Sequence, residues 1–257
     1  MKINNSLNFF NFQSVGIGND NKFERSGDYI PLQKDSLHLW SAWYKDLESH
    51  LPFIENFLSW QDREKSCKFL KPADAKRYVL RHGMLRFILS KYTNTDPELL
   101  PLVNGIQGKP GLHPQSDFHE ISFSLSHADQ VVSVGIVLNH SIGIDIVKTD
   151  PDYPFHEIIE YLFTPLEKEF MRRIEPCQRY LMFFRIWALK EAIVKATGEG
   201  IRLMNSTDVT SVIEDSCTIS SRILKIDEKT MNFVIYEFSP AKSYLGAVAV
   251  CPNPGRK

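Results

Sequence analysis

Two stretches of this chain, residues 123–137 and 236–250, align on each other without gaps. In the first, FSLSHADQVVSVGIV, alternating apolar and polar residues lead into a turn-forming tetrad and then an apolar run, which predicts a strand, a turn and a returning strand. A length of 257 residues is enough for one to two domains, or for one domain with two halves. We therefore predict a mixed α+β fold with a tandem pseudo-repeat, residues 37–139 and 140–251. Chance matching of alternating strands is the alternative.

Periodicity predicts the remaining elements. A first strand begins at His38–Trp40, and helical turns follow to Trp60. Apolar residues at helical spacing predict a helix over residues 74–92, and turn-forming residues predict a loop over residues 104–114. In the second unit we expect a strand at residues 142–147, helices from Phe155, a long helix over residues 183–197 with Gly198 as its C-cap, and strands to the end.

Composition and cysteine usage exclude several classes of protein. The longest uncharged apolar run, Val131–Leu138, is too short to span a bilayer. Residues 1–36 are rich in Asn, Ser, Gly and Asp and contain no secretory-signal pattern, so we expect a weakly ordered extension. The four cysteines lie far apart without a CxxC pair. This disfavours a zinc site or a disulfide framework and indicates free thiols in a cytoplasmic protein.

Positive charge is concentrated in one segment, although the whole chain has a formal net charge of −1. Residues 62–91 contain nine basic and three acidic side chains, a net charge of +6, so the rest of the chain carries −7. Arg77 and Arg81 share a helical face, and no acidic residue lies four positions from Arg77. Most charge runs are solvated helix faces, but this one indicates a local site for an anion, either a polyphosphate or nucleic acid.

An acidic residue in an apolar strand and a charged helix face indicate a cation site. Asp145 lies among isoleucines in SIGIDIVKTD, where a carboxylate is costly unless it is paired or bound to a metal. Trp187, Glu191 and Lys195 lie on one face of the predicted helix, with Lys190 adjacent. Glu191 and Lys195 alone would be an ordinary helix ion pair. With Asp145 they fit a Mg²⁺ site, because Mg²⁺ uses one or two carboxylates plus ligand phosphates.

Four short motifs occur in a specific order: GKP (Gly108–Pro110), SFSLSH (Ser122–His127), GID (Gly143–Asp145) and WALKEAIVKATGEG (Trp187–Gly200). Through them the chain resembles the 4′-phosphopantetheinyl transferases of the surfactin-synthetase-activating type, over residues 36–252. The W-x-x-K-E-x-x-x-K helix downstream of the GID strand makes the set specific. The resemblance implies two similar halves in a pseudo-twofold arrangement, each a small antiparallel sheet with packed helices. It also implies a monomer whose two halves form one cleft.

The resemblance implies transfer of 4′-phosphopantetheine from coenzyme A to a serine of an acyl, peptidyl or polyketide carrier protein, with release of 3′,5′-ADP. It implies that Asp145 and Glu191 bind Mg²⁺, for which Mn²⁺ would substitute. Glu191 would also be the general base, Lys195 would support departure of the leaving group, and His127 would hold phosphate with Ser126 beside it. The other coenzyme A contacts that it implies are Gly108, Lys109 and Pro110 at the nucleotide, Lys65 and Arg77 near the 3′-phosphate, and Lys190.

One position departs from the family pattern. The family often has Glu two residues after the strand aspartate, whereas this chain has Val147. Strand alternation puts positions 145 and 147 on the same face, so a third carboxylate is missing. We predict that water fills that coordination position and that activity survives with weaker metal affinity.

Several neighbouring residues are expected to be structural. Thr164, Pro165 and Glu167 form a capping-box pattern with Pro at the first helical position. Exposed basic residues such as Arg172 and Arg173 would help to dock an acidic carrier protein. The apolar residues that we expect in the core of this region are Phe163, Phe170, Met182 and Phe183.

Two other functions stay open. A non-catalytic binder of coenzyme A or a nucleotide is favoured by Val147 and opposed by the intact acidic residues and lysine of the predicted site. A nucleic-acid-binding protein would use residues 62–91 and would need exposed aromatic side chains between the basic ones. Tyr78 and Phe87 fit a core better, so we expect neither nucleic acid nor a membrane as a partner.

Overall fold

The computed structural model describes residues 11–14, 29–34, 36–105, 108–200, 203–214, 219–226 and 229–252. The predicted weakly ordered extension over residues 1–36 falls mostly outside these ranges. Within the described part of the chain, no helix combines the length and the apolar character that crossing a membrane requires.

The first half of the chain forms one sheet, a short hairpin and a group of helices. In chain order the elements are β1 (Asn11–Ser14), β2 (Leu37–Trp43), α1 (Tyr44–Glu48), α2 (Leu51–Ile54), the 3₁₀ turn η1 (Glu55–Phe57), α3 (Trp60–Ser66), α4 (Pro72–Thr93), η2 (Pro97–Leu99), β3 (Leu102–Asn104), β4 (Pro110–Leu112), β5 (Ile121–Ala128) and β6 (Val131–Leu138).

The second half begins with a strand and ends with three. In chain order the elements are β7 (His140–Lys148), α5 (His156–Leu162), α6 (Pro165–Arg173), η4 (Pro176–Gln178), α7 (Arg179–Thr197), α8 (Thr210–Ile213), β8 (Ile219–Ile226), β9 (Lys229–Phe238) and β10 (Tyr244–Pro252).

The described strands form two four-stranded sheets and one hairpin. The first sheet has the order β1-β2-β6-β5, the second has the order β7-β10-β9-β8, and β3 pairs with β4. β1 pairs with β2 in parallel, whereas every other described pair is antiparallel. The predicted mixed α+β fold with antiparallel sheets and packed helices is therefore confirmed, and β1 adds one parallel pair at the edge of the first sheet.

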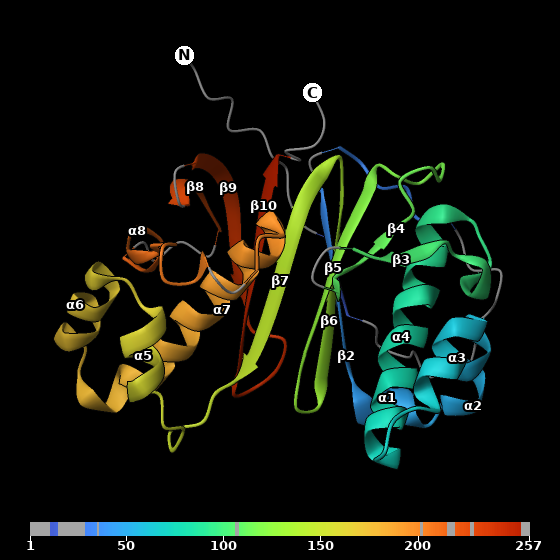
Figure 1. The fold of residues 1–257 in the computed structure, drawn as a ribbon, viewed down its shortest axis with the longest axis horizontal. Coiled ribbons are helices and arrows are strands. Elements are labelled where there is room, and N and C mark those ends of the chain that lie inside the picture. Colours follow the sequence, from blue (N-terminus) through green and yellow to red (C-terminus); the bar gives the residue numbers. More distant parts are fainter. Residues whose placement is uncertain are drawn as a thin grey trace.

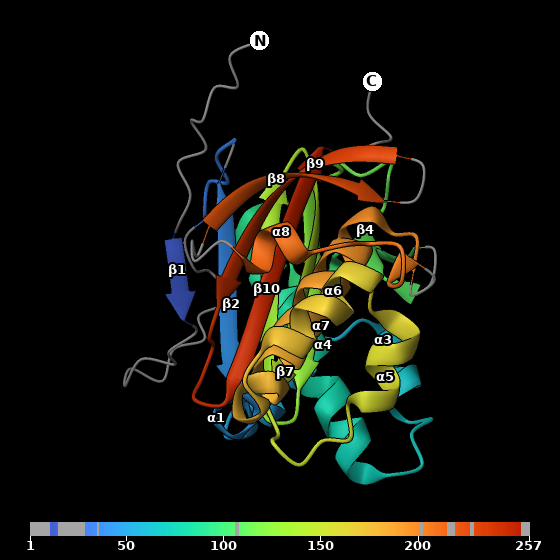
Figure 2. The same cartoon turned by 90° about the vertical axis from the view of Figure 1, so that its left-hand side faces the viewer.

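The two sheets lie next to each other in the centre, and the helices flank them (Figure 1). Helices α1–α4 cover the first sheet, and α5–α7 cover the second. Apolar side chains from both sheets form one cluster between them, including Leu37 and Val137 from the first and Ile144 and Val248 from the second. The view turned by 90° shows α7 lying along β10 and β7 (Figure 2), as their contacts also indicate. β7 also contacts β5 of the first sheet, so α7 lies against the strand that borders the boundary between the two sheets.

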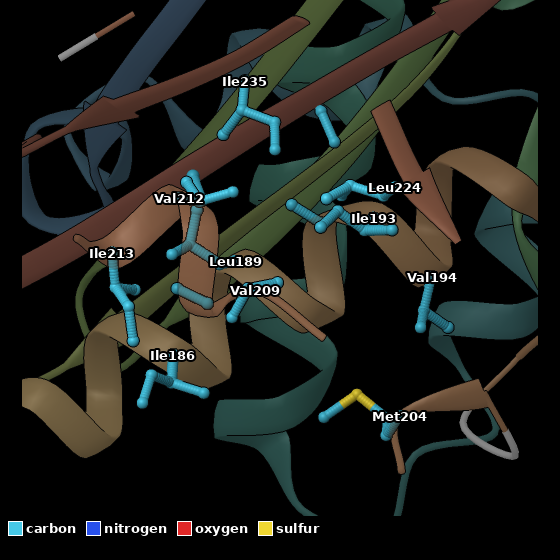
Figure 3. Packing of buried hydrophobic residues seen from close by; sticks show 14 of the residues in the cluster. Ile186, Leu189, Ile193, Val194, Met204, Val209, Val212, Ile213, Leu224 and Ile235 are labelled. Atoms are coloured by element: carbon cyan, nitrogen blue, oxygen red, sulfur yellow. The ribbon is translucent and has the colours of Figure 1, made fainter. Parts of the chain in front are cut away.

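Helix α7 is buried on most of its circumference, which is typical of a helix in the centre of a core. Ile186, Leu189 and Ile193 pack there against residues from the segments that follow the helix, including Val209 and Ile235 (Figure 3). The helix starts earlier than predicted, at Arg179. Its C-cap is confirmed, because Gly198 has a φ of 73° and its N–H bonds to the helix.

Both predicted hairpins form. Residues 123–137 make β5 and β6, which are joined by a turn at Asp129 and Gln130, and residues 236–250 make most of β9 and β10. The prediction of a continuous loop over residues 104–114 is wrong, because Asn104 pairs with Pro110 in the β3–β4 hairpin. Proline and glycine are tolerated in such short edge strands.

Candidate active site

Strand β7 carries a buried carboxylate at the boundary between the sheets. Asp145 is 6% exposed, and its Oδ1 accepts hydrogen bonds from Lys195 Nζ at 2.6 Å and from Ser126 Oγ at 2.8 Å. One donor comes from α7 and the other from β5. Because both donors reach the same oxygen, they compensate the burial of the charge and fix the carboxylate in one orientation.

Helix α7 lies directly against β7 at Gly143. A Cβ atom built there would lie 1.9 Å from the carbonyl oxygen of Ala192 and 2.5 Å from the backbone nitrogen of Ala196. No side chain fits in this space, so the glycine of the GID motif permits the close approach of the helix. This approach brings the face of Glu191 and Lys195 beside Asp145.

Two serines of β5 complete the hydrogen bonding of β7. β7 is an edge strand, so its outward N–H groups need acceptors outside its own sheet. Ser124 Oγ accepts from the N–H of Ile144 at 3.1 Å, and Ser126 Oγ accepts from the N–H of Ile146 at 3.3 Å. The hydroxyl of Ser126 is thus buried and engaged within the protein. Ser126 thus has a structural contact with Asp145, and its predicted contact with coenzyme A stays a prediction.

Glu191 is half-buried one helical turn before Lys195. Burial is the main reason that its pKa is raised; Lys195 lowers this pKa, and the nearby charge of Asp145 raises it further. A carboxyl group with a raised pKa in a cleft is typical of a residue that exchanges protons during a reaction.

Two cavities lie along the same helix. Glu191 and Lys195 line a cavity of about 330 Å³ whose other wall includes residues 108–110. A second cavity of about 630 Å³ lies nearer the start of the helix, where Val147 and Trp187 line it. Glu191 therefore stands next to space for a ligand, and a second, larger cavity lies near Val147 and Trp187.

The acidic residues fit a metal ion held by two protein ligands. In the described part of the chain, no three side chains of the types His, Cys, Asp and Glu gather as a metal site. Val147 is half-buried against the core around α7, on the same side of β7 as Asp145. Asp145 and Glu191 are close enough to repel each other electrostatically, and a divalent cation would relieve that repulsion. Mg²⁺ commonly binds with one or two carboxylates, retained waters and substrate phosphates.

A cluster of cationic side chains lies on the other side of the boundary. Arg81 Nη1 is 2.6 Å from His127 Nε2. Because arginine can only donate, Nε2 is the acceptor and the imidazole is neutral. Desolvation, followed by the charges of Arg81, Lys195 and Arg77, lowers the pKa of His127 to about 4. The histidine is therefore held next to several positive charges without carrying one.

Lys65 and Arg77 join this cluster through aromatic rings. Lys65 Nζ lies 5.4 Å from the ring centre of Tyr78, and Arg81 lies 5.6 Å from the same centre. Arg77 lies 5.9 Å from the ring centre of Tyr44. The structure thus brings together the predicted residues Lys65, Arg77 and His127, and it adds Arg81. The signal for Arg81 was present in the sequence, since it shares a helical face with Arg77.

Two family models match this chain. The model of the 4′-phosphopantetheinyl transferase superfamily matches residues 141–249, and the model described as 4′-phosphopantetheinyl transferase, N-terminal, matches residues 39–137. The chain belongs to the 4′-phosphopantetheinyl transferase superfamily. As a member it is an enzyme that transfers phosphopantetheine to a carrier protein.

Curated relatives agree with this assignment. The 4′-phosphopantetheinyl transferase HetI of Nostoc sp. is 29% identical over 180 residues, which are 70% of this chain and 76% of HetI. The 4′-phosphopantetheinyl transferase psf-1 of Bacillus pumilus is 28% identical over 209 residues, 80% of this chain and 84% of psf-1. The 4′-phosphopantetheinyl transferase Sfp of Bacillus subtilis is 28% identical over 148 residues, so the match spans 58% of this chain and 63% of Sfp.

Lys190 has a structural position in this transferase. It is 0% exposed, and its Nζ lies 2.6 Å from Glu167 Oε2 and donates to the carbonyl of Thr207 at 2.7 Å. Neighbouring residues of a helix point in different directions, so Lys190 faces the core while Glu191 faces the cleft. This burial and pairing favour a structural role for Lys190 over its predicted contact with coenzyme A. The predicted capping box is confirmed, and Glu167 both caps α6 and pairs with Lys190.

In the GKP loop of the transferase, the side chain of Lys109 also bonds to protein atoms. Gly108, Lys109 and Pro110 line the smaller cavity, as expected of a loop near a ligand. The ammonium group of Lys109, however, donates to two backbone carbonyls of the second half, those of Ile142 at 2.7 Å and Lys195 at 2.9 Å. The side chain thus holds protein atoms together.

Proposed function

We propose that this transferase moves the 4′-phosphopantetheine group of coenzyme A onto a serine hydroxyl of a carrier protein and releases 3′,5′-ADP. The observation that carries the proposal is the meeting of Asp145, Glu191 and Lys195 where β7 lies against α7. Carboxylates for a divalent cation and a lysine for phosphate oxygens are the groups that phosphoryl transfer requires.

Asp145 and Glu191 would hold Mg²⁺, or Mn²⁺ in its place. Two carboxylates and the oxygens of a diphosphate suit the preference of Mg²⁺ for hard oxygen ligands. When bound, the ion supplies neutralisation of the negative charge at the diphosphate. Val147 adds no ligand, so water would take the remaining position.

The basic cluster supports a site for the 3′-phosphate. Lys65, Arg77 and Arg81 supply positive charge, and His127 supplies a nitrogen that can take up a proton when a phosphate arrives. Arginine suits this task because its planar group donates to two phosphate oxygens at once.

Each of the two cavities would bind one end of coenzyme A. The nucleotide would lie in the cavity of about 330 Å³ between residues 108–110 and α7. The pantetheine arm would extend past Val147 into the cavity of about 630 Å³, which Tyr153, Phe183 and Trp187 help to line. An apolar lining suits the arm, because most of its surface is aliphatic or amide.

Glu191 is the proposed acceptor of the serine proton. Its carboxylate lines the same cavity as Lys195, which places it to take up a proton there. As the serine oxygen forms its bond to phosphorus, the bond from phosphorus to the leaving 3′,5′-ADP oxygen breaks, and the serine proton passes to Glu191. In the structure Lys195 donates to Asp145. Its long side chain would let the ammonium group turn to the leaving oxygen during the reaction and stabilise the charge that develops there.

The proposed partner is an acyl, peptidyl or polyketide carrier protein, bound by a monomer in the cytosol. Arg172 and Arg173 are exposed and share one acidic partner, Glu169, so a net positive charge remains for an acidic carrier. Tyr161 and Leu166 are large exposed apolar residues on α5 and α6. A reducing compartment is supported by the free cysteines among the described residues, which are Cys67, Cys177 and Cys251.

Neither nucleic acid nor a membrane belongs to this proposal. Tyr78 lies between basic side chains but is 2% exposed, so its ring is not offered to a base. Val147 supports one competing function, a homologue that binds coenzyme A without catalysis, because the acidic ligand expected at this position is replaced.

Incubation of the purified chain with coenzyme A, Mg²⁺ and a panel of apo carrier proteins, read by mass spectrometry, tests the proposal. We expect at least one carrier to gain one phosphopantetheine and the D145N and E191Q variants to lose this activity. Coenzyme A binding without transfer to any carrier would favour the non-catalytic function. Absence of both binding and transfer would refute the proposed substrate.

A further inference from the structure

The side chain of Lys109 crosses from the first half of the molecule to the second. Its Nζ donates to the carbonyl oxygens of Ile142 on β7 and of Lys195 on α7. Lys195 belongs to the last turn of α7, where backbone carbonyls lack partners within the helix. An ammonium group at this end also interacts favourably with the helix dipole. Lys109 therefore acts as a C-terminal cap that is supplied by a distant loop.

The backbone around Lys109 is held by its own hydrogen bonds. The N–H of Gly105 donates to the carbonyl of Lys109 at 2.8 Å, and the N–H of Gly108 donates to the carbonyl of Gly105 at 3.1 Å. Gly108 has a φ of 78°, which favours glycine at this position. These hydrogen bonds hold the backbone at Gly105, Gly108 and Lys109, so the side chain of Lys109 can anchor the GKP segment.

The hydrogen bond to Lys195 joins two chain segments that line one cavity. Residues 108–110 line the space of about 330 Å³, and so do Glu191, Lys195 and Gly198 from the α7 region. We propose that Lys109 is a positioning residue whose ammonium group fastens the GKP loop to β7 and α7 and so sets the width of the nucleotide cavity. This inference rests on the proposed function, because it assigns the cavity to the nucleotide of coenzyme A.

The charge of Lys109 has an expected pH dependence. Desolvation, followed by the charge of Lys195 on α7, lowers its pKa to about 8. Burial raises the pKa of Cys251 on β10 to about 11, so the thiol stays neutral while Lys109 titrates. As the pH rises through about 8, the two hydrogen bonds lose the contribution of the positive charge.

Binding of 3′,5′-ADP to the wild type, K109M and K109R by calorimetry tests the proposal. K109M removes both hydrogen bonds of the ammonium group, and we expect affinity for 3′,5′-ADP to fall about 10–100-fold, with a matching rise in KM for coenzyme A and little change in kcat. K109R keeps the charge and the donors and should recover most of the affinity. K45M is the matched control, since Lys45 of α1 lies over the ring of Trp43 at the end of β2 and does not line the cavity.

The pH profile and hydrogen exchange separate positioning from a direct contact. The affinity of the wild type for 3′,5′-ADP should weaken as the pH rises through about 8. The affinity of K109R should not weaken in this range, because its guanidinium group stays charged. Without ligand, amides of residues 108–112 should exchange faster in K109M than in K45M.

Any of three results would overturn the proposal. These are an amide exchange rate of residues 108–112 in K109M equal to that in K45M, an affinity of K109M for 3′,5′-ADP equal to that of the wild type, and identical pH profiles of this affinity for the wild type and K109R. If K109M does not fold, the K109R profile decides. A wild-type chain that loads carriers while K109M binds normally refutes only this inference, whereas a wild type that binds neither coenzyme A nor 3′,5′-ADP refutes the proposed function.

Discussion

Ser126 on β5 donates its hydroxyl hydrogen to Oδ1 of Asp145 on β7, at 2.8 Å across the boundary between the two sheets. The same hydroxyl accepts from the N–H of Ile146. One side chain thus fixes both the carboxylate and the strand that carries it. Groups that orient a metal ligand typically contribute about 10–100-fold to metal affinity or activity.

Replacement of Ser126 by alanine should therefore raise the Mg²⁺ concentration needed for half-maximal activity by about 10-fold or more. S124A is the matched control, because Ser124 bonds the N–H of Ile144 without touching Asp145. Thermal unfolding should show similar destabilisation for both variants. An equal Mg²⁺ requirement in S124A and S126A would show that Ser126 acts only through the strand.

A glutamate at position 147 should strengthen metal binding. Val147 lies on the same side of β7 as Asp145, so V147E would add a third carboxylate to the proposed site. We expect the Mg²⁺ titration of V147E to shift to lower concentration while the wild type remains active. V147L is the control for the change in size. An inactive wild type that only V147E rescues would contradict the expectation that water suffices at this position.

Removal of Arg81 should weaken recognition of the 3′-phosphate. R81A deletes the charge beside His127, and we expect KM for coenzyme A to rise about 10-fold with little change in KM for 3′-dephospho-coenzyme A. An NMR titration supplies a second measurement, because bound phosphate should raise the pKa of His127 from about 4. Equal effects on both cosubstrates would place the phosphate elsewhere.

Replacement of Lys190 by methionine should affect stability rather than coenzyme A binding. Glu167 would keep a buried charge without its partner, and such a loss typically costs about 3–5 kcal/mol of unfolding free energy. Below the melting temperature, KM for coenzyme A should stay at the wild-type value. E167L/K190M, which removes both charges, should recover part of the stability in chemical denaturation. A raised KM in stable K190M would restore Lys190 as a ligand contact.

Acid should destabilise the fold partly through His82. Burial is the main reason that its pKa falls from 6.5 to about 4, and the ring stacks on Tyr78 with centroids 4.0 Å apart. The unfolded chain therefore binds more protons in this range, so stability is full above about 6.5 and is lost as the pH falls towards 4. H82Q should flatten this part of the stability curve in urea unfolding. If the free energy of unfolding of H82Q depends on pH as steeply as that of the wild type, protonation of His82 does not contribute to the acid destabilisation.

The sequence was sufficient for residues whose local pattern determines their surroundings. Period-two alternation predicted the β5–β6 hairpin, and the sequence around Thr164 predicted its capping box. Asp145 could be singled out because a charge among isoleucines needs a partner. Its pairing with Lys195 then follows from the approach of α7 to β7.

Local sequence patterns did not predict the contacts between distant segments of the chain. Lys190 and Glu191 are neighbours in sequence, and only the packing of α7 decides that one pairs with Glu167 in the core and the other lines the cleft. Lys109 and Ser126 belong to motifs with expected ligand contacts, yet their polar atoms bond to backbone or side-chain atoms of the other half. Such bonds depend on how two sheets meet, which local periodicity does not encode.

Gly143 places a demand on this site although it contributes no functional group. A single added methyl group would collide with the helix backbone and drive α7 away from β7. Glu191 and Lys195 would then recede together from Asp145, with every ionisable group still present. The spacing of the catalytic groups thus depends on a residue without a side chain. A substitution of Gly143 would inactivate the enzyme by displacing α7, without removing any reacting group.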